Sequence, residues 1–186
     1  LRHLDRCGEI LASQLATIEG VDFVGICDLN EGRAKRSAEG VTKKGHTPKV
    51  YFGEENGWKK MLAETKPDAV FIATPWNLHA PMCVASMKAG AHAFSEVPIA
   101  VTLEEMWEIV DTSEATGRHC MMMENVNYGR EELVYLNMVR QGVIGELLHG
   151  EAAYIHELRG QMENGDSTGS WRTFQYAKRN GNLYPT

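Results

Sequence analysis

The sequence lacks the features that mark several large classes of protein. It has no apolar run near the roughly 20 residues that a membrane-spanning helix needs, and no internal repeat or low-complexity segment. Its net charge of −6 argues against a nucleic-acid backbone as partner, and the absence of a lysine-rich tract argues against a membrane surface. What is left is an ordinary globular composition, with 43% hydrophobic and 24% charged residues.

Cysteine is scarce and shows no metal-binding pattern. None of the four, Cys7, Cys27, Cys83 and Cys120, is part of a CxxC motif, and at least two lie in apolar runs. Reduced, buried thiols are therefore the favoured interpretation, with metal ligation a distant second. This favours a reducing compartment, but the sequence starts without methionine and a signal peptide would not be visible. The compartment stays undetermined between cytoplasmic and periplasmic or secreted, and we expect a longer protein.

A glycine-rich phosphate loop of the form GxGxxG is also absent. The start of the chain is nevertheless typical of a dinucleotide-binding fold, because a helical pattern over 1–19 precedes the β-rich run 21–27, which ends in Asp28. We expect the first strand and its glycine loop to lie before Leu1. Asp28 would then accept hydrogen bonds from the ribose of the cofactor's adenosine. The alternative is that it caps the helix that begins near Glu31.

Residues 68–98 are the stretch around which the rest of the chain is organised. They predict a short strand at 69–73, a helix at 79–88 that stops at Gly90, and a second strand at 91–94. A strand, a helix and a strand in this order form the βαβ unit of a nucleotide-binding sheet.

Polar residues gather where both strands of this unit end. One cluster lies at 76–79 and the other includes Glu96 and Val97. Ligands of open parallel sheets bind outside the carboxyl ends of the strands, so both clusters are candidate ligand contacts. The structural alternatives are simple packing for Trp76 and the start of a helix for His79.

The flanking segments continue the alternation of helices and strands. Helices are predicted at 31–44, 57–65, 102–117 and 131–141, and strands at 49–52, 119–124 and 147–156. Thr102 and Glu105 predict a capping box at the start of the third helix. The pattern changes near Val126, which predicts a dinucleotide-binding domain at 1–125, incomplete at its N-terminus, and the start of a second domain at 126–186.

Three of these sites resemble the motifs of a known family. Asp28, the Ala-Thr-Pro of 73–75 with His79, and the Glu-Val-Pro of 96–98 are similar to those of the glucose–fructose oxidoreductase, inositol dehydrogenase and MocA (Gfo/Idh/MocA) family. The resemblance implies a Rossmann-like α/β domain with a doubly wound parallel sheet, then a C-terminal α/β domain with an open, mostly antiparallel sheet. It implies NAD as cofactor, since the Asp28 carboxylate would repel the 2′-phosphate of NADP.

Val97 indicates one branch of this family. Most of its dehydrogenases carry lysine at this position, near the reacting carbon, and valine can neither donate a proton nor orient a hydroxyl. Together with several short motifs, the chain resembles the NAD-dependent α-N-acetylgalactosaminidases of glycoside hydrolase family 109. The motifs are Met123-Glu124-Asn125 with Tyr128, Asn137-Met138-Val139, Gly145-Glu146-Leu147, Tyr154-Ile155-His156, Trp171-Arg172 and Tyr184-Pro185-Thr186.

This resemblance implies a hydrolase in which NAD is a recycled catalyst. Hydride passes from sugar C3 to NAD⁺, and the ketone that results acidifies the C2 proton, which a base removes. The C1 substituent leaves, water adds, and NADH returns the hydride, so that the net reaction is hydrolysis. The implied partners are NAD and a small-molecule or glycan substrate, with a homo-oligomer formed through the C-terminal sheet and no metal.

The resemblance also assigns roles to individual residues. Tyr154 is the implied C2 base and a substrate contact, and it needs nearby positive charge because an unperturbed tyrosine pKa is about 10. Arg172 and Tyr184 are further implied substrate contacts, and a catalytic histidine is expected directly after Thr186. The implied cofactor contacts are Asp28, Trp76, Asn77, Leu78, His79, Glu96, Val97 and Asn125.

Other interpretations stay open beside this one. Without the resemblance, Tyr154 is a sheet-face aromatic and Asn125 a cap. An ordinary NAD(P)-dependent sugar or cyclitol dehydrogenase is the second functional hypothesis, and Val97 argues against it. A non-catalytic sensor of sugar or dinucleotide is the third, and the presence of Tyr154 with Arg172 and Tyr184 argues against it.

Overall fold

Five short parallel strands and the helices around them form the body of the protein. The computed structural model describes residues 2–125, 127–153, 155 and 157. The strands are β1 (Gly25–Asp28), β2 (Lys49–Phe52), β3 (Ala69–Ile72), β4 (His92–Ser95) and β5 (Cys120–Met122). The helices are α1 (Arg2–Leu15), α2 (Glu31–Thr42), α3 (Gly57–Thr65), α4 (His79–Lys88), α5 (Leu103–Thr116) and α6 (Arg130–Arg140), with a 3₁₀ turn, η1, at Trp76–Leu78.

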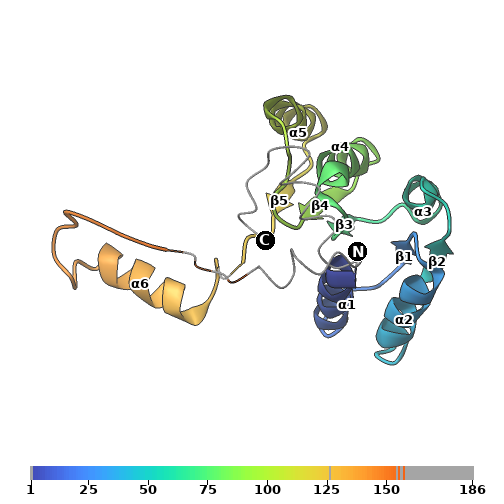
Figure 1. The fold of residues 1–186 in the computed structure, drawn as a ribbon, viewed down its shortest axis with the longest axis horizontal. Helices are drawn as coiled ribbons and strands as arrows, with labels where there is room; N and C mark the ends of the chain where they lie inside the picture. Colours follow the sequence, from blue (N-terminus) through green and yellow to red (C-terminus); the bar gives the residue numbers. More distant parts are fainter. Residues whose placement is uncertain (1, 126, 154, 156, 158–186) are drawn as a thin grey trace.

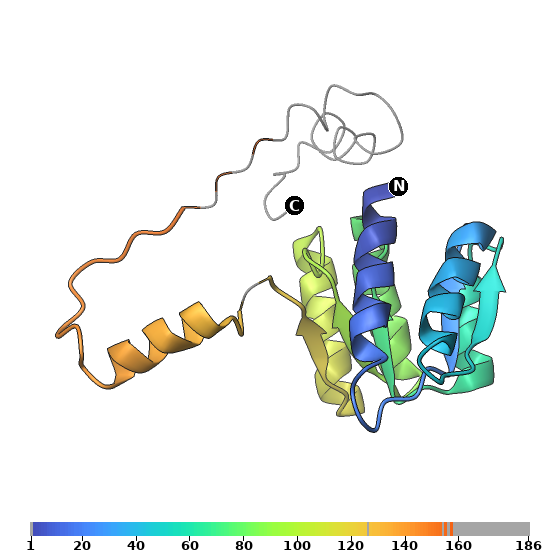
Figure 2. The same cartoon turned by 90° about the horizontal axis from the view of Figure 1, so that it is seen from below.

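The helices cover both faces of the strands, as in a doubly wound fold. Figure 1 shows β1 and β2 between α2 and α3, which both pack on this strand pair. On the other side of the body, α4 and α5 pack together over β3 and β4, while α1 lies on the opposite face beside α2 (Figures 1 and 2). The predicted α/β class with parallel strands is confirmed.

The strands form two sheets rather than one. β1 pairs with β2, and β3, β4 and β5 pair in that order, all in parallel. A dinucleotide-binding sheet runs in the order 3-2-1-4-5-6, so one further strand between β1 and β3 would join the two sheets into this pattern. No strand occupies this position in the described ranges. It is the position at which we expect the first strand of the fold.

Local sequence signals explain where the helices begin and end. Thr102 and Glu105 form the predicted capping box, in which the Glu105 amide donates to Thr102 Oγ1 over 3.2 Å. α5 then ends at Gly117, whose φ of 64° suits glycine. The N-cap of α2 is Asn30, whose Oδ1 accepts from the Arg33 amide at 3.0 Å. Asp28 therefore does not cap this helix.

A single apolar cluster holds α4 and α5 against the three-stranded sheet. Its buried members are Ile72, Ala80, Met82, Cys83, Val84, Met87, Ala93, Ala100 and Ile109. Burial of each large side chain of this kind stabilises the fold by about 1.5–3 kcal/mol. In the other sheet, a Cβ at Gly25 would lie 2.9 Å from Met61 Cγ, so that glycine allows α3 to approach β1 closely.

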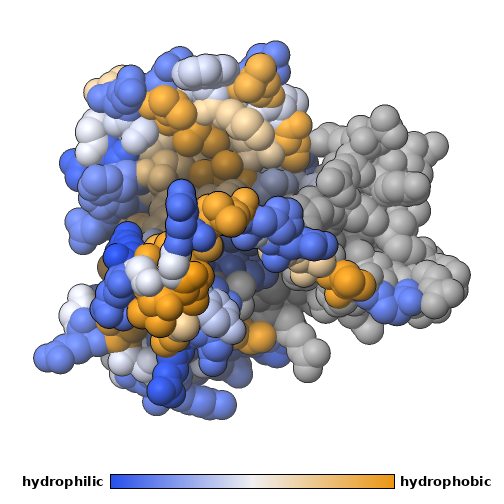
Figure 3. Space-filling view, turned by 90° about the vertical axis from the view of Figure 1, so that its left-hand side faces the viewer, coloured by the Kyte–Doolittle hydropathy of each residue, from blue (hydrophilic) through white to orange (hydrophobic). Residues whose placement is uncertain are grey.

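The segment after Asn125 contains the predicted helix but not the strand predicted at 147–156. α6 has no buried residue, and apolar side chains on it, such as Leu133 and Leu136, are exposed. Figure 3 views the molecule from the α6 side. Residues 147–153 form neither helix nor strand, so the prediction of a strand there is wrong for the described part of this stretch. A strand needs a neighbour to hydrogen-bond with, and the described residues offer none at this place.

No helix among the described residues is both long and apolar enough to cross a membrane.

Candidate functional site

The predicted cofactor contacts all follow the carboxyl ends of strands. Asp28 is the last residue of β1, and η1 with the start of α4 comes after β3. Glu96 follows β4, and Asn125 lies shortly after β5. Because the strands within each sheet are parallel, these residues lie at the carboxyl-end edge of their own sheet, which is where α/β proteins bind ligands.

Side-chain and backbone groups of α2 and the turn before it hold Asp28, whose side chain remains 30% exposed to solvent. The Arg33 guanidinium contacts it through Nε, 3.1 Å from Oδ1 and 3.0 Å from Oδ2, and through Nη2, 2.9 Å from Oδ1. The Asn30 amide donates to Oδ1 over 2.7 Å. Each carboxylate oxygen has two lone pairs, so Oδ2 keeps acceptor capacity for a ribose hydroxyl. Asp28 therefore fits the adenosine end of NAD.

Arg33 is a component of this site that sequence reasoning missed. Its side chain comes from the first turn of α2, one turn beyond the N-cap, and returns to the end of β1. The signal in the sequence that could have identified this contact is the basic Arg33 five positions after the acidic Asp28, across a predicted strand-to-helix turn. A guanidinium with its planar fork fixes the direction of a carboxylate, which a flexible ammonium would not.

His79 lies completely buried between the loops that follow β3 and β4. Nδ1 is 2.7 Å from the Pro98 carbonyl oxygen, and Nε2 is 2.7 Å from that of Thr74. Burial lowers the pKa of the His79 imidazole, while the backbone carbonyls of Pro98, Thr74 and Glu96 act in the opposite direction. Carbonyl oxygens only accept, so the imidazolium donates to both of them, whereas the neutral ring donates to one and contacts the other through its unprotonated nitrogen.

The neighbours of His79 in η1 differ in exposure. Trp76 is 5% exposed, whereas Asn77 is exposed and Leu78 packs partly against the apolar cluster. Asn77 is therefore the residue of η1 whose side chain is open to a ligand, and Trp76 is part of the protein interior. Their predicted cofactor contacts stay predictions.

Two carboxyl groups, those of Glu96 and Glu124, lie near enough to interact electrostatically where β4 and β5 end. The strands are in register with Ser95 beside Met122, and the Met123 amide donates to the Ser95 carbonyl over 2.8 Å. Burial raises the pKa of the Glu96 carboxyl, and the negative charge of Glu124 raises it further. Glu124 is a second group that sequence reasoning did not select. Two acidic groups therefore lie at these strand ends, and the raised pKa of Glu96 favours its protonated form.

Two further predicted cofactor contacts, Val97 and Asn125, lie beside this carboxyl pair in the sequence. Val97 is half-buried and precedes Pro98 through a cis peptide bond. The exposed Asn125 donates its amide N–H to Glu124 Oε1 over 3.0 Å. The three predicted substrate contacts, Tyr154, Arg172 and Tyr184, lie outside the described residues.

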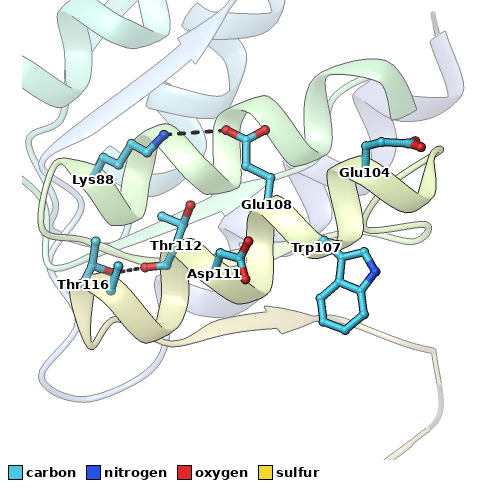
Figure 4. Close-up of a pocket in the computed structure, with 8 residues that line it drawn as sticks. Lys88, Glu104, Trp107, Glu108, Asp111, Thr112 and Thr116 are labelled. Atoms are coloured by element: carbon cyan, nitrogen blue, oxygen red, sulfur yellow. Dashed lines mark hydrogen bonds and ion pairs between the residues drawn. The ribbon is translucent and has the colours of Figure 1, made fainter.

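A separate surface pocket lies on the outer side of α5. Figure 4 shows its lining, with the Lys88 ammonium 3.6 Å from Glu108 Oε1 and Trp107 turned away from this ion pair. The lining residues are Lys88, Glu104, Trp107, Glu108, Asp111, Thr112, Ala115 and Thr116. None of the predicted cofactor contacts is among them, so this pocket is not the candidate site.

Comparison with known proteins identifies the fold around this site. The sequence model of the oxidoreductase family with an NAD-binding Rossmann fold, Gfo/Idh/MocA, matches residues 7–124. The chain belongs to this family. Residues 128–186 match a second model, that of the C-terminal domain of glycosyl hydrolase family 109. The resemblance expected from Asp28, 73–79 and 96–98 is confirmed, and with it the NAD-binding fold.

Curated relatives of this Gfo/Idh/MocA chain carry family 109 names. Glycosyl hydrolase family 109 protein 1 of Akkermansia muciniphila is 62% identical over 181 residues, which cover 96% of this chain and 38% of the relative. An α-N-acetylgalactosaminidase of Shewanella oneidensis is 56% identical over 175 residues, covering 93% of this chain and 38% of that protein. The chain thus spans less than half the length of these relatives.

Solved structures of the Gfo/Idh/MocA fold agree with the architecture. A myo-inositol 2-dehydrogenase from Lactobacillus plantarum superposes with a TM-score of 0.66 at 24% identity. A scyllo-inositol dehydrogenase from Lactobacillus casei, with bound NAD(H) and scyllo-inositol, gives 0.66 at 22% identity. Each match covers 76% of this chain and 40% of the other. At these identities the likeness shows the fold.

Proposed function

We propose that the full-length protein is an NAD-dependent glycosidase that hydrolyses terminal α-N-acetylgalactosamine or closely related glycosides. The observation that carries this proposal is the match of residues 128–186 to the C-terminal domain of glycosyl hydrolase family 109. The high identity to relatives with that family name supports it. Val97, in place of the lysine of the family's dehydrogenases, supports it as well.

The described residues have defined tasks in this proposal. NAD, when bound, accepts a hydride from the sugar and returns it, so hydrolysis needs no net oxidant. The Asp28 carboxylate, oriented by Arg33, holds the adenosine ribose through Oδ2. Val97 contributes an apolar wall at the end of β4 that neither gives nor takes a proton. Tyr154 removes the C2 proton, and Arg172 and Tyr184 bind the sugar.

The organisation of the whole protein follows from the same proposal. Residues 1–125 form the cofactor domain and 126–186 begin the substrate domain, a division that the ranges of the two family models support. The substrate domain also forms a homo-oligomer through its sheet. A small-molecule or glycan substrate, and no nucleic acid, is the expected partner.

One assay on the full-length protein separates this function from its rivals. The protein is incubated with p-nitrophenyl α-N-acetylgalactosaminide and catalytic NAD⁺, and both nitrophenol and NADH are followed. Nitrophenol release without accumulating NADH is the expected result. No nitrophenol from the glycoside, with steady NADH formation in a parallel incubation with free sugar and excess NAD⁺, would replace the proposal with a dehydrogenase. Ligand binding with neither product would replace it with a sensor.

A further inference from the structure

The loops after β3 and β4 form two walls of the proposed cofactor site, and no backbone-to-backbone hydrogen bond joins them within the described part of the chain. The first wall is Thr74–Leu78, and its Leu78 amide donates to the Pro75 carbonyl over 2.9 Å, within the same loop. The second wall is Ser95–Pro98, and its Glu96 amide donates to Ile72 of β3 over 2.9 Å. Both loops contain a proline, which has no N–H to donate. Side chains therefore have to make much of the connection.

The His79 side chain supplies this connection, because its ring lies between the two loops. Its ring nitrogens lie 2.7 Å from the carbonyl oxygen of Thr74 in the first wall and 2.7 Å from that of Pro98 in the second. The side chain is 0% exposed, while Thr74 and Pro98 are half-buried. Loss of a hydrogen-bond donor from a carbonyl that is partly shielded from water lowers stability, because its desolvation is then not compensated. The ring thus joins two backbone segments that belong to different strands.

The ring is completely buried and both of its nitrogens lie against backbone carbonyls, so no ring atom is left to contact a ligand. We propose that His79 is a positioning residue, which ties the Thr74–Leu78 loop to the Ser95–Pro98 loop and so fixes the two walls of the NAD site to each other. The sequence resemblance implied a direct cofactor contact for His79, and this proposal replaces that contact with an indirect effect. It rests on the proposed function only in assigning these walls to NAD.

Two substitutions in the full-length protein each preserve one half of the connection. In His79→Asn the side-chain amide lies near the former Nδ1 and retains the bond to Pro98. In His79→Gln the amide reaches the former Nε2 position and retains the bond to Thr74. Ser86→Ala is the matched control, because Ser86 is also buried on α4 and its Oγ donates to the Met82 carbonyl over 2.7 Å, away from both loops.

The first readout is backbone hydrogen exchange without NAD. Peptides that cover Thr74–Leu78 and Ser95–Pro98 are expected to exchange faster in both His79 variants than in Ser86→Ala. The second readout is NAD affinity by calorimetry, expected to weaken at least ~10-fold in each His79 variant and to stay within about 2-fold in the control. Equal effects in the control, or unchanged exchange in the loops, would overturn the proposal.

The outcomes separate this proposal from the proposed function. Weaker NAD binding with unchanged loop exchange would restore His79 as a direct contact and sink the positioning role. Faster loop exchange in a protein that does not bind NAD would retire the proposed function and leave the connection standing. If the variants do not fold, ¹⁵N-histidine spectra of the unaltered protein serve instead. The His79 ring signals should then keep their positions on NAD saturation, and a large shift overturns the proposal.

Discussion

Asp28 and His79 show two ways in which a residue at a strand end serves a site. The Asp28 carboxylate is bonded to Arg33 and Asn30 on one side and open on the other, so it can take a ligand hydroxyl. The His79 ring is buried with each of its nitrogens 2.7 Å from a backbone carbonyl oxygen, so it is closed to any ligand. The sequence resemblance placed both in one class, and their burial separates them.

At the residue scale, the substitution Arg33→Met tests the orientation of Asp28. Loss of the guanidinium removes a charge-assisted contact to Asp28, and we expect NAD affinity of the full-length protein to fall about 10-fold. Arg36→Met is the control, because Arg36 is exposed on the same helix as Arg33 and its Nε pairs with Glu9 Oε1 of α1 over 3.2 Å, away from Asp28. Calorimetric titration with NAD measures both. Tighter binding in Arg33→Met would mean that Arg33 competes with the ribose.

A second residue-scale prediction concerns pH. Burial and the charge of Glu124 raise the pKa of Glu96 above its unfolded value, so the folded state holds this proton more tightly. The stability that Glu96 contributes at low pH is therefore lost as pH rises from about 4.3, the unfolded value, through the folded one. Glu96→Gln should make the protein more stable than wild type at neutral pH, with the difference shrinking in acid.

Thermal unfolding of the full-length protein from pH 4 to 8 measures this difference. Glu114→Gln, which removes an exposed charge on α5, is the control and should show no such trend. A Glu96→Gln protein that is less stable than wild type at neutral pH would contradict the prediction.

At the scale of elements, α5 owes its first turn to a local signal. Thr102→Ala removes the bond from the Glu105 amide to Thr102 Oγ1, and the helix should lose about 1 kcal/mol. Thr116→Ala is the control at the other end of α5, where Thr116 Oγ1 donates to the Thr112 carbonyl over 2.7 Å. Hydrogen exchange at the start of α5 should rise in the first variant alone. Equal exchange in both would show that tertiary packing, not the cap, fixes this end.

Elements with such local signals were predictable, and an element without a partner was not. The capping box and Gly117 set the ends of α5 within the sequence itself. The predicted strand over 147–156 rested on composition and partial alternation alone. Strand formation also needs hydrogen bonds to a second strand, and residues 147–153 have no such neighbour in the described part of the chain.

At the scale of the whole molecule, the interruption between β1 and β3 bears directly on binding. Dinucleotides cross doubly wound sheets at this point, and in the proposed site Asp28 would lie on one side of it and the loops after β3 and β4 on the other. We expect the 186 residues alone to bind NAD at least ~10-fold more weakly than the full-length protein, because the two halves of the site are held in separate sheets. Calorimetry on both proteins measures this ratio. Equal affinities would show that packing of α1 against α2 aligns the halves well enough.

The sequence by itself determined which residues stand at the strand ends, because apolar runs, turn residues and caps are local patterns. It placed Asp28, the 76–79 cluster and Glu96 at one edge of parallel strands, and its motifs identified the family. Only the tertiary structure decided what these side chains do there. Arg33 reaches Asp28, Glu124 acts on Glu96, and His79 lies between two carbonyls. These relations depend on burial and on distances between segments far apart in the chain, which no local pattern encodes.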